Sequence, residues 1–258
     1  MAEVVRQGSG PPLLLVHGLG SSLRSWDPIL PELAKNREVI SFDLPGHGRT
    51  PAEPDSGTFA GLARSVEAFL VEQGLEGVDI VGASLGARLS LEMARRGRVG
   101  ATVALGPGGF WRGWERAFFG STIGASLRLV RAILPAAPML SRNAAARSLL
   151  MIQFSARPWR LDPSLVETEL RTLASTPTAL ALVRDLARGP EQQGPAASSS
   201  GRVTLGWGRQ DRVCLPRQAA RAQAAFPTAA LHWFDACGHL PAWDQPQATT
   251  RLILANTG

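Results

Sequence analysis

The sequence predicts an α/β fold in which a mostly parallel central sheet is flanked by helices and interrupted by one helical insertion. Strand-like and helix-like segments alternate along most of the 258 residues, which is typical of a parallel sheet. Residues 12–16 form a continuous apolar run, as expected for a strand buried on both faces. Residues 110–186 contain helical patterns but no convincing strand. A chain of this length can bury about three quarters of its unfolded surface in one fold.

The first half of the chain supplies four predicted strands and three predicted helices. The apolar runs predict strands at residues 12–16, 38–42, 78–83 and 101–105. Apolar residues at helical spacing predict helices at residues 22–35, 58–73 and 85–96. The fourth strand ends at Gly106-Pro107-Gly108-Gly109, where the alternation stops.

The second half divides into an insertion and a return to the sheet. Residues 189–201 are rich in Gly, Pro and Ser and predict a loop. Strands are predicted again at 203–207 and 230–234, with helices at 216–225 and 245–255. We therefore expect a core made of residues 1–109 and 190–258, and a helical cap made of residues 110–189.

Composition excludes several classes of function. The net charge is +6, but the basic residues are nearly all Arg and are scattered, Lys35 being the only Lys, so we expect no nucleic-acid partner. Cys214 and Cys237 are the only cysteines, which fits a reducing, cytoplasmic setting. Residues 1–6 do not resemble a signal peptide, and no apolar run approaches the ~18 residues of a membrane span. The sequence leaves a homo-oligomer open.

The segment Gly82-Ala83-Ser84-Leu85-Gly86 is the most informative in the chain. It follows a short apolar run and precedes a helical pattern, the context of the nucleophile elbow of serine hydrolases. Side chains two positions either side of the apex would clash in so tight a turn, so Gly82 and Gly86 are small for a steric reason. The strain lifts the Ser84 hydroxyl clear of the sheet.

A serine hydroxyl needs a base within hydrogen-bond reach and a group that orients the base. Of the four histidines, only His239 is both near the C-terminus and on a loop at the expected active edge. Asp211 follows a late strand and completes the chain order Ser, Asp, His. Asp235 is the competing carboxylate, and its alternative role is turn chemistry.

Together these motifs resemble the α/β-hydrolase superfamily, and in particular bacterial esterases and C–C hydrolases with a helical cap. Residues 8–12 leading to His17-Gly18-Leu19-Gly20 resemble its first strand and oxyanion loop, and residues 43–48 its Asp-x-x-Gly-His-Gly turn. Residues 207–213 and 238–239 resemble its acid and histidine loops.

The resemblance implies that Ser84 attacks the substrate, His239 transfers the proton and Asp211 holds the imidazole. It also implies that the backbone N–H groups of Leu19 and Leu85 stabilise the oxyanion. His17 and His47 would then structure loops, and no cofactor is expected.

The absence of residues typical of related enzyme families leaves hydrolysis of a carboxylic ester as the default reaction. The resemblance implies an acyl-enzyme intermediate, and the aromatic residues of the insertion favour an apolar small molecule as the substrate. Ser84 stands where epoxide hydrolases and haloalkane dehalogenases carry Asp. Epoxide hydrolases also use tyrosines of the cap, and this chain has no Tyr. The main alternative is C–C bond hydrolysis of ring-cleavage products, because Trp243 matches a Trp of those enzymes. However, Leu240 replaces their usual Trp, and Arg171 is only a rough candidate for their lid cation.

Lactonase, thioesterase and perhydrolase activities are related alternatives, and a ligand receptor with slow turnover is a non-enzymatic one. Candidate substrate-binding residues are the aromatic ones nearest the elbow: Phe110, Trp111, Trp114, Phe118 and Trp243. At helical spacing Trp111, Trp114 and Phe118 would share one face, which we expect to look down on Ser84. No cluster of metal-ligating residues is visible in the sequence.

Overall fold

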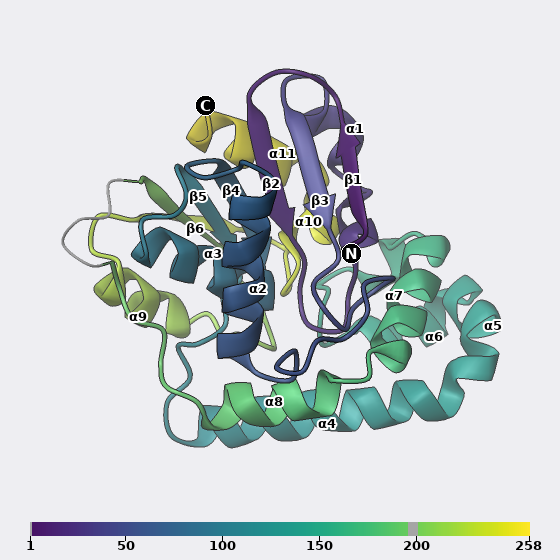
Figure 1. The fold of residues 1–258 in the computed structure, drawn as a ribbon. Helices are drawn as coiled ribbons and strands as arrows, with labels where there is room; N and C mark the ends of the chain where they lie inside the picture. Colours follow the sequence, from purple (N-terminus) through teal and green to yellow (C-terminus); the bar gives the residue numbers. More distant parts are fainter. Residues whose placement is uncertain (1, 196–200) are drawn as a thin grey trace.

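The computed structural model describes residues 2–195 and 201–258, and its core is a seven-stranded sheet (Figure 1). The strand order is β1-β3-β2-β4-β5-β6-β7, with β1 antiparallel to β3 and every other pair parallel. The strands are Val4–Gln7 (β1), Pro12–Val16 (β2), Glu38–Phe42 (β3), Asp79–Ala83 (β4), Thr102–Leu105 (β5), Val203–Gly208 (β6) and Ala230–Phe234 (β7). The predicted mostly parallel sheet is confirmed.

Strand β2 shows how the sheet is buried on both faces. Leu14 and Val16 point to one face, in a cluster with helices α2 (Phe59–Glu72), α3 (Leu85–Arg95) and α9 (Gln218–Ala225). Leu13 and Leu15 alternate to the other face, against α1 (Leu30–Leu33) and α11 (Pro246–Asn256). All four side chains are fully buried, so the continuous apolar run has the meaning that was predicted for it.

Three elements differ from the sequence prediction, and one of them is the four-residue helix α10 (Pro241–Asp244), which was not predicted. The helix expected at residues 22–35 is divided into a 3₁₀ turn, η1 (Leu23–Trp26), and the short helix α1. Pro28 and Pro31 fall inside that window and have no N–H to donate, so a continuous helix cannot form there. The antiparallel edge strand β1 was not predicted at all, because its four residues carry too little pattern.

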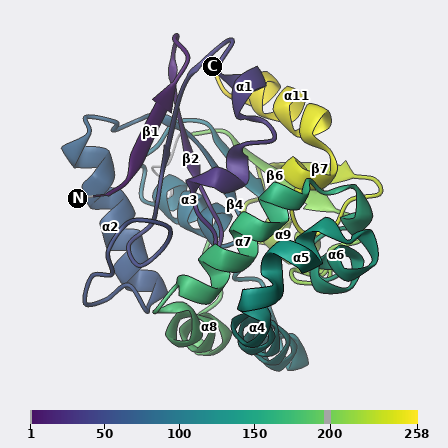
Figure 2. The ribbon, with the colours of Figure 1, turned by 90° about the vertical axis from the view of Figure 1, so that its right-hand side faces the viewer.

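Helices replace strands over the described residues between β5 and β6. They are α4 (Trp114–Ile133), η2 (Leu134–Ala136), α5 (Ala137–Arg142), α6 (Ala144–Met151), η3 (Pro158–Arg160), α7 (Pro163–Ser175) and α8 (Ala179–Arg188). Figures 1 and 2 show them gathered below the sheet, with α4 and α8 side by side. They enclose a small apolar core of their own around Val130, Val166 and Leu170. Residues 189–195 form neither helix nor strand, and residues 196–200 of the predicted loop lie outside the described residues.

The helical stretch Trp114–Arg142 is long and apolar enough, by length and composition alone, to cross a membrane. The stretch is not a continuous apolar run, because Glu115, Arg116, Arg128 and Arg131 interrupt it, so the expectation that the chain has no membrane span stays a prediction. One such helix is weak evidence for a span, because the core helix of a soluble protein meets the same criterion.

Candidate active site

Ser84 lies at the apex of a sharp turn between β4 and α3. Its backbone has φ 56° and ψ −114°, a left-handed conformation that a residue with a side chain seldom adopts. A Cβ atom on Gly82 would lie 2.2 Å from the Gly86 carbonyl oxygen, and one on Gly86 would lie 2.0 Å from the Val16 carbonyl oxygen. Only glycine fits at either position, for the steric reason that the sequence indicated.

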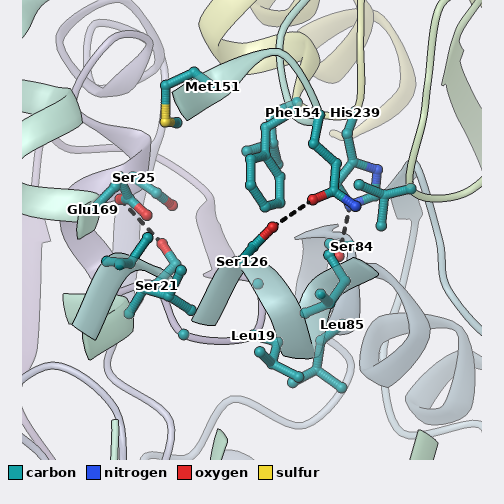
Figure 3. Close-up of a pocket in the computed structure, with 18 of the residues that line it drawn as sticks. Leu19, Ser21, Ser25, Ser84, Leu85, Ser126, Met151, Phe154, Glu169 and His239 are labelled. Carbon is teal, nitrogen blue, oxygen red and sulfur yellow. Dashed lines mark hydrogen bonds between the residues drawn. The ribbon is translucent and has the colours of Figure 1, made fainter. Parts of the chain in front are cut away.

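The structure joins Ser84, His239 and Asp211 in one hydrogen-bonded chain. His239 Nε2 lies 2.8 Å from Ser84 Oγ (Figure 3). His239 Nδ1 lies 2.9 Å from Asp211 Oδ2. The three residues follow β4, β7 and β6, whose carboxyl ends meet at one edge of the sheet. This shared edge brings His239 next to Ser84, 155 positions earlier in the sequence, and next to Asp211, 28 positions earlier.

Asp211 is held in place by backbone donors as well as by the histidine. Its Oδ1 accepts from the N–H groups of Val213 at 2.8 Å and Cys214 at 2.9 Å. Asp211 and His239 are each only 2% exposed. Asp235, the competing carboxylate, has an 85% exposed side chain that pairs with Arg209 instead of His239.

The two residues predicted to supply the oxyanion hole, Leu19 and Leu85, both lie close to Ser84. Leu85 is the first residue of α3, so its N–H has no acceptor within the helix. Gly18 brings the loop that carries Leu19 against the elbow, since a Cβ on Gly18 would lie 3.3 Å from Ser84 Cβ. Leu19 and Leu85 both line the same cavity as Ser84.

His17 and His47 are buried and serve the neighbouring loops. His17 Nε2 accepts from the Leu44 N–H at 3.0 Å, so its Nδ1 carries the proton that is donated to the Gly18 carbonyl at 2.8 Å. Burial lowers the pKa of His17 to about 4 and that of His47 to about 3, so both rings are neutral. Neither ring is bonded to Ser84, in agreement with the predicted loop-structuring role.

Ser84 opens into a cavity of about 230 Å³ that runs between the sheet edge and the cap. Most of its wall is apolar, and Trp111, Phe119 and Ile123 supply part of it. Trp111 stacks on Phe119 with ring centroids 4.3 Å apart. Further lining residues, Leu129, Leu149 and Ile152, are each more than half exposed and therefore mark the mouth.

Three of the five aromatic residues predicted to bind substrate, Phe110, Trp114 and Phe118, do not line the cavity. Helix α4 begins only at Trp114, so Trp111 precedes the helix and does not share a helical face with Trp114 and Phe118. Trp114 is 58% exposed, packs edge-on against Phe118 and lies under Arg217 outside the cavity. Phe110 is buried in the core.

Trp111 and Trp243 are the two aromatic candidates that do line the cavity. The Trp243 indole N–H donates to the Ser25 carbonyl at 3.1 Å, so its ring is fixed against η1.

A polar group that the sequence analysis missed lines the cavity away from the elbow. Glu169 on α7 is 7% exposed, and the Ser21 hydroxyl donates to its Oε1 at 3.1 Å. Figure 3 shows Ser21 and Glu169 on one side of the cavity and Ser84 with His239 on the other. Burial raises the pKa of Glu169 to about 8, so the carboxyl is mostly protonated at neutral pH. A Glu inside an amphipathic helix gives no local signal of such a position.

Asp244 is the second functional candidate that the sequence analysis missed. Its carboxylate accepts from the Gly238 N–H at 2.7 Å, the Ala156 N–H at 2.8 Å and the Ser155 hydroxyl. The backbone N–H of His239 in turn donates to the Phe154 carbonyl at 2.8 Å. The histidine loop is thus fastened directly to the cap.

Two arginines bear on which charges a substrate can carry. Arg171, the sequence candidate for a lid cation, is an exposed residue paired with Glu167 and does not line the cavity. Arg88 does line it, but its guanidinium donates to the Pro190 carbonyl at 2.7 Å and lies over the Phe59 ring. Over residues 2–195 and 201–258 no group of three or more His, Cys, Asp or Glu is placed to hold a metal ion.

A family model, curated relatives and solved structures all identify similar proteins for this chain. Residues 13–252 match the model of the alpha/beta hydrolase family. A dihydrolipoyllysine-residue acetyltransferase component of an acetoin cleaving system from Cupriavidus necator is 30% identical over 98% of this chain, which spans 65% of that relative's length. A 2-hydroxy-6-oxononadienedioate/2-hydroxy-6-oxononatrienedioate hydrolase from Cupriavidus pinatubonensis is 26% identical over 94% of this chain and 85% of its own. A thermophilic esterase from Thermogutta terrifontis superposes with a TM-score of 0.75 at 20% identity, covering 98% of this chain and 92% of that one.

Proposed function

This chain belongs to the alpha/beta hydrolase family, and from that membership and the site geometry we propose that it hydrolyses carboxylic esters of small, largely apolar molecules. The observation that carries the proposal is the bonded chain Asp211–His239–Ser84, which ends in a mainly apolar cavity. A hydroxyl oxygen that lies 2.8 Å from an imidazole nitrogen is within reach of a base that can take its proton as it attacks.

The proposed reaction proceeds through an acyl-enzyme. Asp211 accepts from the Nδ1–H of His239, which leaves the lone pair of Nε2 facing the Ser84 hydroxyl. Ser84 Oγ attacks the ester carbonyl while Nε2 takes its proton, and the same proton then goes to the departing alcohol. Water attacks the acyl-enzyme in the second half, with Nε2 taking its proton and returning it to Ser84 Oγ.

The oxyanion of both half-reactions would be stabilised by the N–H groups of Leu19 and Leu85. Backbone donors that are fixed before the reaction cost no reorganisation as charge develops on the carbonyl oxygen. They also explain why the side chains at these two positions can be apolar.

The cavity favours small acyl or alcohol groups with little charge. Its volume of about 230 Å³ falls below the ~300 Å³ at which ligand pockets usually begin, and its entrance is bordered by Leu129, Leu149 and Ile152. Each methylene buried there adds about 0.8 kcal/mol, or about fourfold in kcat/KM, until the cavity is full.

Hydrolysis of a C–C bond in a ring-cleavage product is the second candidate. Relatives with that name cover nearly the whole chain, and Trp243 and Arg88 both line the cavity. Against it, Arg171 does not reach the cavity, Arg88 is already bonded to a carbonyl, and Glu169 would repel a substrate carboxylate whenever it is ionised.

A specificity series separates the two candidates. Measure kcat/KM for p-nitrophenyl esters of increasing acyl length and for a 2-hydroxy-6-oxodienoate, with Ser84→Ala as the blank. We expect a rise of about fourfold per methylene followed by a plateau, and slower turnover of the dienoate. Flat rates along the esters, or faster turnover of the dienoate, would reject the ester proposal. Turnover far below about 1 per second on every substrate would favour the ligand-receptor alternative.

A further inference from the structure

We propose that Glu169 and Ser21 form a polar subsite that binds an uncharged hydrogen-bonding substituent of the substrate, such as a hydroxyl or ether oxygen. The substituent lies at the end of the molecule away from the bond that Ser84 attacks. This inference rests on the proposed ester hydrolysis and adds a substrate class to it: esters with a polar but uncharged far end, in preference to purely apolar or anionic ones.

The position of Glu169 is the first argument. Its side chain belongs to the cap, on α7, whereas Ser21 belongs to the loop after β2, so the two meet across the cavity. Figure 3 shows the pair clearly separated from Ser84 and His239. A substrate that spans the cavity therefore meets the carboxyl at its far end.

The second argument is the unused bonding capacity of the carboxyl. Ser21 Oγ occupies Oε1, and no other hydrogen bond or ion pair to Glu169 is formed by the described residues. The second oxygen of this carboxyl is not fully enclosed by protein and remains accessible from the cavity, so a hydrogen-bond partner for it can come from the cavity. A bound substituent with a hydroxyl or ether oxygen supplies that partner.

The third argument is the absence of a neutralising charge among the described residues. The charges that act on the pKa of Glu169 are the carboxylates Asp27 and Asp43, and both raise it further. The elements packed against α7 are η1, η2, α4 and α5, and η2 carries no charged residue. The other charged side chains on these elements are Arg24, Glu115, Arg116, Arg128, Arg131 and Arg142. Five of these side chains bind groups other than Glu169. Arg24 pairs with Asp27, and Glu115 pairs with Arg217 and Arg221. Arg116, Arg128 and Arg131 each donate to a backbone carbonyl.

These surroundings hold the proton on Glu169 at neutral pH, where its pKa is about 8. A protonated carboxyl donates one hydrogen bond and accepts others, so it suits a hydroxyl or an ether. A substrate carboxylate bound beside Glu169 would be a buried negative charge without a cation to pair with, so anionic substrates would bind poorly.

The catalytic test compares esters that differ only at the far end. Prepare p-nitrophenyl esters whose acyl chains end in methyl, hydroxyl, methoxy or carboxylate, at several chain lengths, together with the corresponding alkyl and glycol esters. At the length that spans the cavity we expect the hydroxyl-ended ester to exceed the methyl-ended one by about tenfold in kcat/KM. The carboxylate-ended ester should be the poorest.

Three variants assign the preference to the carboxyl. Glu169→Leu should reverse the ratio of hydroxyl-ended to methyl-ended rates, and Glu169→Gln should keep it above one. Glu167→Leu is the matched control, since Glu167 lies on the same helix but pairs with Arg171 at the surface, and its ratio should equal that of the native protein. A ratio that is identical in native protein and Glu169→Leu would overturn the subsite while ester hydrolysis itself stands.

A binding experiment keeps the inference testable even if no ester is hydrolysed. With Ser84→Ala, measure by calorimetry the Kd of alkanols, the matching diols, ether alcohols and amino alcohols. We expect diols and ether alcohols to bind about tenfold more tightly than alkanols of equal length at neutral pH. The ether alcohols should lose this advantage above about pH 8, because an ether oxygen can only accept a hydrogen bond and Glu169 no longer donates one. Equal binding of diol and alkanol, or tightest binding of the amino alcohol at neutral pH, would overturn the subsite.

Discussion

Replacing Asp211 by Asn should lower kcat by about 10⁴ while leaving the fold intact. The Asn carbonyl oxygen can still accept from the N–H groups of Val213 and Cys214, as Asp211 Oδ1 does now. Its amide NH₂ then faces His239 Nδ1, where a carboxylate oxygen lies at 2.9 Å in the native protein. The histidine must place its proton on Nε2, toward Ser84, and can no longer accept the serine proton.

The productive tautomer of His239 could return only if the Asn amide flipped, and the free-energy cost of that flip can be bounded. It would point the NH₂ group at two buried N–H donors and remove both of their hydrogen bonds. Each buried donor left unsatisfied costs about 1–3 kcal/mol. The unproductive tautomer therefore dominates, and a 10⁴-fold loss corresponds to roughly 5 kcal/mol in the activation free energy.

The matched control is Asp235→Asn. Asp235 makes an exposed ion pair with Arg209, and such pairs contribute less than about 1 kcal/mol. Its kcat on a p-nitrophenyl ester should stay within about twofold of native, and thermal unfolding should confirm that both variants fold. A larger loss in Asp235→Asn than in Asp211→Asn, with both proteins folded, would refute the assignment of the orienting acid.

Three further predictions concern the nucleophile, the cavity wall and the buried carboxyl. A fluorophosphonate should label native protein but not Ser84→Ala, whose kcat should fall by on the order of 10⁶; labelling that persists would place the nucleophile elsewhere. Trp111→Leu should enlarge the cavity and raise kcat/KM of long esters relative to short ones several-fold, whereas Trp114→Leu should not; an equal response to both would mean that the cavity wall is misassigned. Folded Glu169 keeps its proton up to about pH 8, whereas the unfolded chain loses it near ~4.3, so native stability should fall as pH rises between these values. Glu169→Gln should remove that decline and gain up to a few kcal/mol over native protein by pH 8, measured by urea unfolding; a pH-independent difference would show that the carboxyl is not protonated in the fold.

The sequence by itself predicted the six parallel strands of the sheet and the residues of the bonded chain at its edge, but not the antiparallel edge strand β1. The apolar run at residues 12–16 could only be a strand covered on both faces, and Gly82 and Gly86 could only flank a turn too tight for side chains. The choice of Asp211 and His239 followed from chain order, because loops after neighbouring parallel strands must meet at the same edge. These inferences are local or topological, so they do not depend on how distant side chains pack.

The cap was different, because the face that a helix buries depends on how it docks. The aromatic run after β5 predicted one apolar wall, but α4 begins at Trp114, and this start separates Trp111, which lines the cavity, from Trp114, which lies outside it. Glu169 and Asp244 showed no sequence signal, since each acquires its role from partners brought close by the cap: Ser21 for one, and residues 155–156 for the other. Local sequence fixes spacing along an element, whereas the rotation and register of one element against another arise only when the whole core packs.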